Sequence, residues 1–164
     1  AHWAEEIMPA RLRRLSPVAR ERVKELLTLL DSGNGDALAE FGALLGGADD
    51  YDPLPDEEPA PFRDESLQAA ELRRSGEIYN GVWPRAAEMR RNGELLRAAS
   101  AIRCPVVAIH GEHDPHPWRG VKEPLERVLP EFSFHLLLRC GHTPWLERQA
   151  RGEFFKLLEQ ALES

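Results

Sequence analysis

Two loops in the last third of the chain carry the residues best suited to catalysis. The apolar run 104–110 leads to Asp114, and a second apolar run, 132–139, leads to His142. Both runs have the length and composition of β-strands, and the stretch between them has a helical pattern. A strand–helix–strand unit places its strands side by side and parallel, so the loops that follow them leave the same sheet edge. We therefore expect Asp114 and His142 to meet, as an aspartate that orients a histidine base does.

The residues around this pair resemble the C-terminal part of the α/β-hydrolase superfamily. Its members typically read Cys-Pro-Val, an apolar run and Gly-x-x-Asp at the acid strand, then Gly-His-x-Pro-x-x-Glu at the histidine loop. Here these motifs occupy 104–114 and 141–147. The resemblance implies that Asp114 is the orienting acid and that His142 serves as general base and then general acid. Glu112 is the nearest rival acid, and a simple Asp-Pro turn is the other interpretation of Asp114.

The nucleophile that this family requires is missing from the sequence. In the family the nucleophile precedes the acid, which precedes the histidine. No serine here stands in a Gly-x-Ser-x-Gly elbow, and the oxyanion-hole loop is also missing. We expect a C-terminal fragment of a serine-type hydrolase, inactive alone, whose serine lies outside this chain. The intact protein would hydrolyse an ester, amide or related bond of a small-molecule substrate, and it would need no cofactor.

The expected fold class is α/β, a partial α/β-hydrolase fold with two regions. Residues 1–100 have helical patterns, with Ser16-Pro17 as a helix start. Further helices are expected near 36–45, 67–74, 77–91 (possibly broken before Pro84) and 94–99. The resemblance implies a helical cap over the active site, although a plain helical bundle packed on the sheet would give the same pattern. The resemblance implies that residues 101–164 form the C-terminal part of the hydrolase core.

An acidic, proline-rich stretch at 49–65 separates helices of the first region. It holds eight acids and only Arg63 as a base, so it accounts for the whole net charge of −7. We interpret it as a solvated linker, with a docking site for a basic partner as the alternative. An acidic balance argues against a nucleic-acid partner, because phosphates would be repelled.

Composition gives expectations about the cellular setting. No run approaches the ~18 apolar residues that span a bilayer, so no membrane partner is expected. The first residues lack the basic and apolar regions of a signal peptide. The cysteines, Cys104 and Cys140, fall at opposite ends of neighbouring strands, too far apart to bond. Free thiols favour a cytoplasmic protein.

Other chemically active residues have simpler interpretations. His110, His113 and His116 cluster near Asp114 and suggest zinc, but their order does not fit the binuclear zinc-hydrolase pattern, so no metal site is expected. His113 and Trp145 are expected to line the substrate pocket. Cys140 is expected to be buried rather than nucleophilic.

Two parallel strands rarely stand alone, because parallel sheets are normally larger and covered on both faces. We therefore expect an N-terminal hydrolase portion, or self-association, to complete the sheet. A non-catalytic interaction module that retains hydrolase-like strands is the alternative function. The last helix is expected to turn one apolar face inward, made of Phe154, Leu157, Leu158, Ala161 and Leu162.

Overall fold

The computed structural model describes residues 3–32, 37–55, 78 and 81–163. The elements with assigned bounds are α1 (Trp3–Arg14), α2 (Pro17–Asp31), α3 (Ala37–Asp49), α5 (Glu94–Ala99), β1 (Val106–Gly111), α6 (Trp118–Glu126), β2 (Phe132–Leu137), a 3-10 turn η1 (Pro144–Leu146) and α7 (Arg151–Glu163). Residues 81–91 are also helical, without a break at Pro84. The expected helix at 67–74 lies outside the described residues.

The described strands form one parallel pair, as the sequence predicts. β1 and β2 are in register from Val106 opposite Phe132 to Gly111 opposite Leu137. Both strands are shorter than expected. Pro105, which precedes β1, has no N–H to donate to a ladder, and the chain turns after β2 through Arg139, whose φ is 51°. The mixture of helices and parallel strands is of the α/β class.

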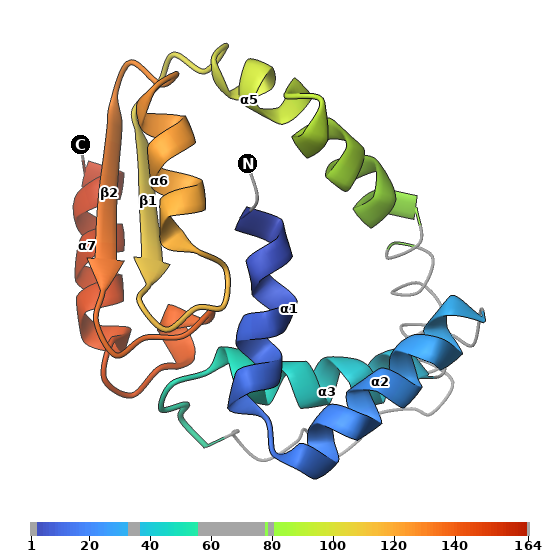
Figure 1. Ribbon diagram of the computed structural model, residues 1–164. Coiled ribbons are helices and arrows are strands. Elements are labelled where there is room, and N and C mark those ends of the chain that lie inside the picture. The colour runs from blue at the N-terminus through green and yellow to red at the C-terminus, as the bar shows by residue number, and fades with distance from the viewer. Residues whose placement is uncertain (1–2, 33–36, 56–77, 79–80, 164) are drawn as a thin grey trace, which may run out of the picture.

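Helices cover both faces of this strand pair, α6 on one side and α7 on the other (Figure 1). Because side chains alternate along a strand, β2 contributes to both layers. Phe134 faces α6, where its ring centroid lies 5.9 Å from that of Trp118. Leu137, 1% exposed, joins Cys140 and Ala150 in a cluster on the α7 side. The sheet is therefore the middle layer of three.

The inner face of α7 is smaller than the sequence suggests. Phe154 and Leu157 pack against the cluster of Leu137. Leu158 is 36% exposed, however, and Leu162 is 78% exposed. The apolar side chains of α7 thus extend past the area that β1 and β2 cover.

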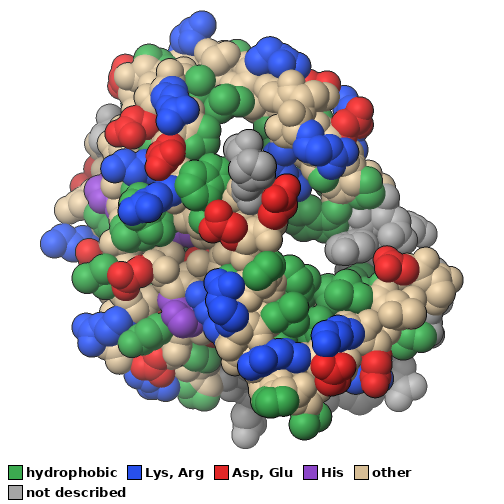
Figure 2. All heavy atoms as spheres, in the orientation of Figure 1, with side chains coloured by type: hydrophobic (Ala, Val, Ile, Leu, Met, Phe, Trp, Pro, Cys, Tyr) green, Lys and Arg blue, Asp and Glu red, His purple; other side chains and the backbone are tan. Residues whose placement is uncertain are grey.

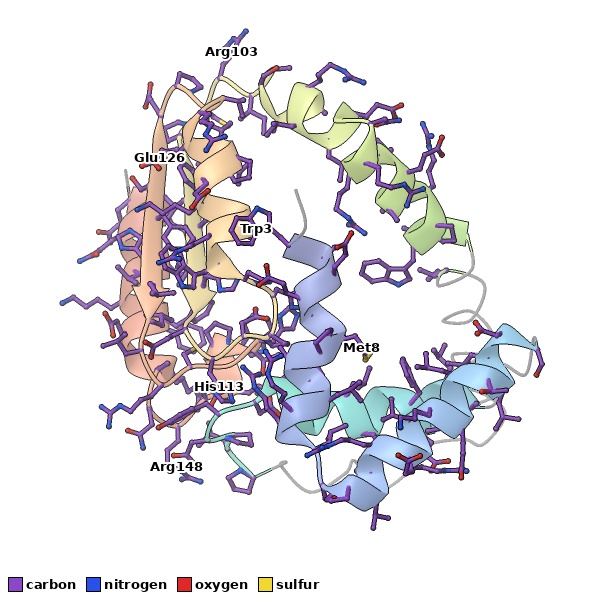
Figure 3. All side chains as sticks on the ribbon, viewed as in Figure 1. Trp3, Met8, Arg103, His113, Glu126 and Arg148 are labelled. Atoms are coloured by element: carbon purple, nitrogen blue, oxygen red, sulfur yellow. The ribbon has the colours of Figure 1, made fainter. Side chains whose placement is uncertain are left out.

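The N-terminal helices have a core of their own. Ser16 caps α2 by accepting a hydrogen bond from the Ala19 N–H at 3.2 Å, and Pro17 follows at the first helical position. The buried residues of this core come from α2 and α3: Val23, Leu26, Ala37, Phe41 and Leu45. Met8 reaches the same core from α1 (Figure 3). In the space-filling view this face of the molecule is hollowed between the helical segments, with hydrophobic side chains around the hollows (Figure 2).

The start of the acidic stretch differs from the expected linker. Helix α3 continues four residues past the predicted end and includes Asp49. The chain then packs against the turn before α7: the Leu54 N–H donates to the Leu146 carbonyl at 2.7 Å, and the Arg148 N–H to the Asp52 carbonyl at 2.9 Å. Residues 50–54 are therefore held by backbone bonds, and residues 56–65 lie outside the described part.

No helix in the described part of the chain combines the length and the apolar character needed to cross a membrane.

Leu26→Ala should destabilise the protein. The side chain is 1% exposed between α2 and α3, and truncating a buried leucine costs about 2–5 kcal/mol through lost burial and a residual cavity. Leu29→Ala on the same helix is the matched control, because Leu29 is 37% exposed. Urea denaturation followed by circular dichroism should show a large drop in unfolding free energy for the first variant only. Equal losses for both would contradict this packing.

Candidate active site

Asp114 and His142 meet where the two strands end. His142 Nδ1 lies 2.8 Å from Asp114 Oδ2, and because a carboxylate only accepts, the imidazole donates. The Asp114 side chain is 7% exposed and that of His142 is 51% exposed. A buried acid thus holds a half-exposed histidine by one ring nitrogen, so the other ring nitrogen, Nε2, is the one that can exchange protons with a substrate or nucleophile.

The loops that carry the pair are joined backbone to backbone. The Glu112 N–H donates to the Leu137 carbonyl and the His113 N–H to the Cys140 carbonyl, each at 2.8 Å. Gly111 lies so close to the other loop that a Cβ there would collide with the carbonyl oxygens of Cys140 and Gly141. Only glycine permits this approach, and the approach brings the two strand ends together.

Asp114 accepts more hydrogen bonds than a catalytic pair requires. Its Oδ1 accepts from His116 Nδ1 at 2.7 Å and from the His116 backbone N–H at 2.8 Å. His110 Nε2 lies 3.7 Å from Oδ2. Burial by itself would raise the pKa of Asp114, but the hydrogen bonds from His116 and His142 outweigh it and hold the pKa well below its usual range. The carboxylate is therefore ionised at neutral pH.

A second carboxylate, Glu147, fixes the histidine loop. Its side chain is fully buried. Its Oε1 accepts from the N–H groups of Gly141 (2.7 Å) and Tyr51 (2.8 Å), and its Oε2 accepts from the Asp52 N–H (2.7 Å). One side chain thus ties the residue before His142 to a segment about 95 residues earlier.

The helical region contacts the same loop through Asp49. The His142 N–H donates to the Asp49 carbonyl at 3.0 Å. The Asp49 carboxylate, in turn, accepts two bonds from Arg11 of α1, at 2.7 Å from Nε and 2.6 Å from Nη2. Planar, bidentate arginine–carboxylate pairs are geometrically specific, so α1 and α3 have a defined position at the edge of the site.

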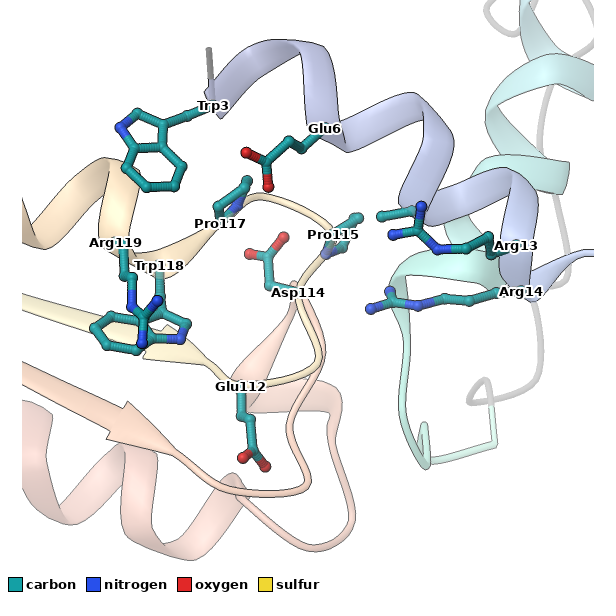
Figure 4. A pocket seen from close by; sticks show the side chains of 11 residues that line it. Trp3, Glu6, Arg13, Arg14, Glu112, Asp114, Pro115, Pro117, Trp118 and Arg119 are labelled. Atoms are coloured by element: carbon teal, nitrogen blue, oxygen red, sulfur yellow. The ribbon is translucent and has the colours of Figure 1, made fainter. Parts of the chain in front are cut away.

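A cleft of about 270 Å³ opens beside Asp114, between α1 and the start of α6 (Figure 4). Its lining carries three arginines, three carboxylates and two tryptophans among eleven residues: Trp3, Glu6, Ala10, Arg13, Arg14, Glu112, Asp114, Pro115, Pro117, Trp118 and Arg119. Its formal charges balance, and it has apolar and aromatic surface.

His113 and Trp145, the two residues predicted to line the substrate pocket, make contacts away from this cleft. The ring of His113 makes an edge contact with Tyr51, with centroids 5.3 Å apart, and burial followed by the nearby Arg14 cation lowers its pKa. Trp145 packs against Phe154 of α7, at 5.8 Å between centroids. Neither borders the cleft. Trp118, at the start of α6, does border it.

The cysteines are both free, with Cys104 exposed and Cys140 buried. Burial, with the nearby Glu147 charge, raises the pKa of the Cys140 thiol to about 12. A thiol that stays protonated at neutral pH is a poor nucleophile, which agrees with its expected role as a small buried side chain.

The group of candidate metal-ligand atoms in the structure differs from the histidine cluster that the sequence brought to attention, for which no metal site was expected. Among the described residues, Asp114, His116 and His142 bring candidate ligand atoms within 4.8 Å of one another. His113 faces Tyr51 instead. The cluster therefore joins both loops, whereas the sequence suggested three histidines from the first.

Sequence reasoning did not assign the roles that Glu147 and His116 have in this site, and it missed the Arg11–Asp49 pair. Glu147 was visible as the last residue of the histidine-loop motif, but its role is to bind backbone amides of a distant segment. His116 reaches Asp114 through a turn only two residues long. The Arg11–Asp49 contact spans 38 positions and left no local signal.

Glu147→Gln should loosen the His142 loop and destabilise the protein. The amide would lose the negative charge and turn an NH₂ group toward backbone donors, and a hydrogen bond to a charged group is worth about 1.5–3 kcal/mol. We expect a loss of at least about 2 kcal/mol of unfolding free energy. Glu159→Gln, at an exposed position of α7, is the control. Denaturation curves of the two variants that coincide would argue against this role.

Comparison with family models, with curated proteins and with solved structures found no match to this chain. The relationship to the α/β hydrolases therefore stays a prediction from the sequence motifs. The geometry of Asp114, His142 and their surroundings carries the functional interpretation.

Proposed function

We propose that this chain is the C-terminal part of a serine-type α/β-hydrolase and supplies its acid and its base. The observation that carries the proposal is the 2.8 Å hydrogen bond between His142 Nδ1 and Asp114 Oδ2. It joins two loops at neighbouring ends of parallel strands, in the chain order of acid then histidine. The sequence motifs around both residues agree with the same assignment.

In the proposed reaction His142 transfers the proton. Its Nε2 takes the proton of a serine hydroxyl as that oxygen attacks an acyl carbon, and then delivers it to the leaving group. Asp114 keeps Nδ1 protonated and stabilises the imidazolium that forms. The low pKa of Asp114 suits this role, because the acid stays ionised while the imidazole gains its charge.

The serine of this reaction is proposed to lie outside the chain. Of the seven serines, four are described. Ser16 caps α2, and the hydroxyls of Ser32 and Ser100 donate to carbonyls of their own helices. Ser133 pairs with Val107, near the start of the strands and away from the catalytic edge.

The cleft beside Asp114 is the proposed substrate region. It combines the indole rings of Trp3 and Trp118 with charged groups of both signs. Aromatic walls favour a substrate with an apolar part, and a few polar groups can orient it. In this proposal α1 forms part of the cap, and its salt bridge to Asp49 sets how far it lies from the catalytic edge.

The decisive experiment uses a longer polypeptide that contains this chain together with its upstream coding sequence. A Gly-x-Ser-x-Gly motif is expected there, and its serine should be labelled by a fluorophosphonate. His142→Ala should slow labelling by at least about 100-fold, since a positioned general base contributes on that order, and Asp114→Asn should also slow it. Mass spectrometry of the intact and digested protein locates the label.

His113→Ala is the control, because His113 lies in the acid loop but contacts Tyr51 rather than Asp114. It should label at the parent rate. The proposal fails if the upstream sequence has no such motif, if His142→Ala labels normally, or if the 164-residue chain alone is labelled at one of its own serines.

We also propose that the sheet is completed by further strands, from an N-terminal hydrolase portion or from a second copy. Among the described residues β1 and β2 pair only with each other, so each has an outer edge. The exposed apolar side chains of Leu158 and Leu162 on α7 extend past the two strands, as expected if α7 also packs against strands beyond them. Unpaired edges and apolar stripes favour association.

The 164-residue chain should accordingly self-associate when isolated. Light scattering coupled to size-exclusion chromatography should give a mass above that of one 18.5 kDa chain. Addition of the N-terminal portion, expressed separately, should replace the self-association with a one-to-one complex. A clean monomer over a wide concentration range would contradict the proposal.

The alternative function is a non-catalytic interaction module with hydrolase-like strands. It predicts that the chain binds a partner but takes part in no hydrolysis. The two functions separate in the labelling experiment: a module would bind its partner equally well with His142→Ala and would lack a labelled serine. The buried, ionised Asp114 with its oriented imidazole favours the hydrolase, because association alone requires neither.

A further inference from the structure

Asp114 binds two imidazoles, whereas the proposed hydrolase reaction requires only the one of His142. His142 Nδ1 lies 2.8 Å from Oδ2, and His116 Nδ1 lies 2.7 Å from Oδ1. The two rings lie next to each other in a tilted arrangement, with centroids 4.8 Å apart and planes inclined by 33°. Both Nδ1 atoms are therefore turned toward the same carboxylate, one from each strand-end loop.

We propose that Asp114, His116 and His142 together bind one divalent metal ion of the zinc type. One carboxylate oxygen and two imidazole nitrogens are a donor set that suits zinc, and three protein ligands plus a water complete its four-coordinate shell. The candidate atoms already lie within 4.8 Å of one another. No other role in the proposed reaction requires His116.

The distances allow an ion to enter with small movements. Zinc holds nitrogen and oxygen ligands at about 2.0–2.1 Å, so tetrahedral neighbours are about 3.3 Å apart. His116 Nδ1 lies 2.7 Å from Oδ1 and His142 Nδ1 lies 2.8 Å from Oδ2, so the nitrogen beside whichever oxygen binds the ion would have to move away from it by about half an ångström. The His142 and His116 side chains are 51% and 35% exposed, which leaves them room to shift and gives the ion access from solvent.

The carboxylate is already held in place for this role. The His116 backbone N–H donates to Asp114 Oδ1 at 2.8 Å and keeps the acid in its turn. Its low exposure of 7% limits its freedom further. An anchored carboxylate with two adjustable imidazoles is a preorganised site, and such outer contacts raise metal affinity.

Metal binding and proton transfer would exclude each other. An ion on Nδ1 of a neutral imidazole moves the remaining ring proton to Nε2, and no electron is transferred. His142 Nε2 would then carry a proton and could not accept one from a serine. This consequence rests on the proposed hydrolase function, whereas metal binding itself does not.

Calorimetric titration of the 164-residue chain with zinc alone, in a non-chelating buffer near neutral pH, tests the site. We expect one ion per chain. His116→Ala and His142→Ala should each weaken binding by at least about tenfold, since even the loss of a supporting contact costs that much. His113→Ala, in the same loop but facing Tyr51, should bind as the parent does. Circular dichroism confirms that each variant is folded.

Visible absorption and nitrogen chemical shifts report directly on the ligands of the ion. Cobalt in place of zinc should give the intense visible absorption of a four-coordinate site, and the band should vanish in His116→Ala. The imidazole nitrogen resonances should show the metal on Nδ1 of both histidines. The proposal is overturned if zinc does not bind, if His113→Ala weakens binding as much as His116→Ala, or if the nitrogen shifts leave His116 unaffected. Fluorophosphonate labelling that succeeds without zinc binding would leave the hydrolase proposal standing, and the reverse result would leave only the metal site.

Discussion

The buried carboxylate of Glu147 is the contact on which the arrangement of this site depends. It binds three backbone amides from two parts of the chain, the histidine loop and the segment after α3. A buried charge is tolerated only when its lone pairs are satisfied, so these amides and the carboxylate require one another. The position of His142, the docking of α3 and the Arg11–Asp49 pair all follow from this junction.

Two carboxylates in this region have opposite tasks because of their different partners. Within the described part of the chain, Glu147 accepts hydrogen bonds from backbone N–H groups and so acts on the path of the chain. Asp114 accepts from imidazoles and acts on their orientation and protonation. Glu147 thus fixes the histidine loop through its backbone, whereas Asp114 lines the cleft. The loop geometry and the orientation of the imidazoles are therefore set by two different carboxylates, Glu147 and Asp114.

The sequence was enough to predict the local parts of this structure. The apolar runs 104–110 and 132–139 predicted two strands, and parallel pairing predicted that Asp114 and His142 would meet. Contacts between distant segments could not be predicted. An acidic, proline-rich stretch has the composition of a solvated linker, and nothing local showed that residues 50–54 dock on the turn before α7. The orientation of Trp145 toward α7 likewise depends on packing that sequence spacing does not encode.

The close approach of Gly111 to the carbonyls of Cys140 and Gly141 has a consequence for how such a site can diversify. At this point the loops meet through main-chain atoms, so their closest approach requires a glycine at position 111 and uses no side chain there. Cleft residues of α1, such as Trp3 and Glu6, lie outside both loops, so they can change with little effect on the distance between Asp114 and His142. Insertions between Gly111 and Asp114 would be far more disruptive than substitutions on α1. The lining of the cleft could thus change while the contact between Asp114 and His142 is kept.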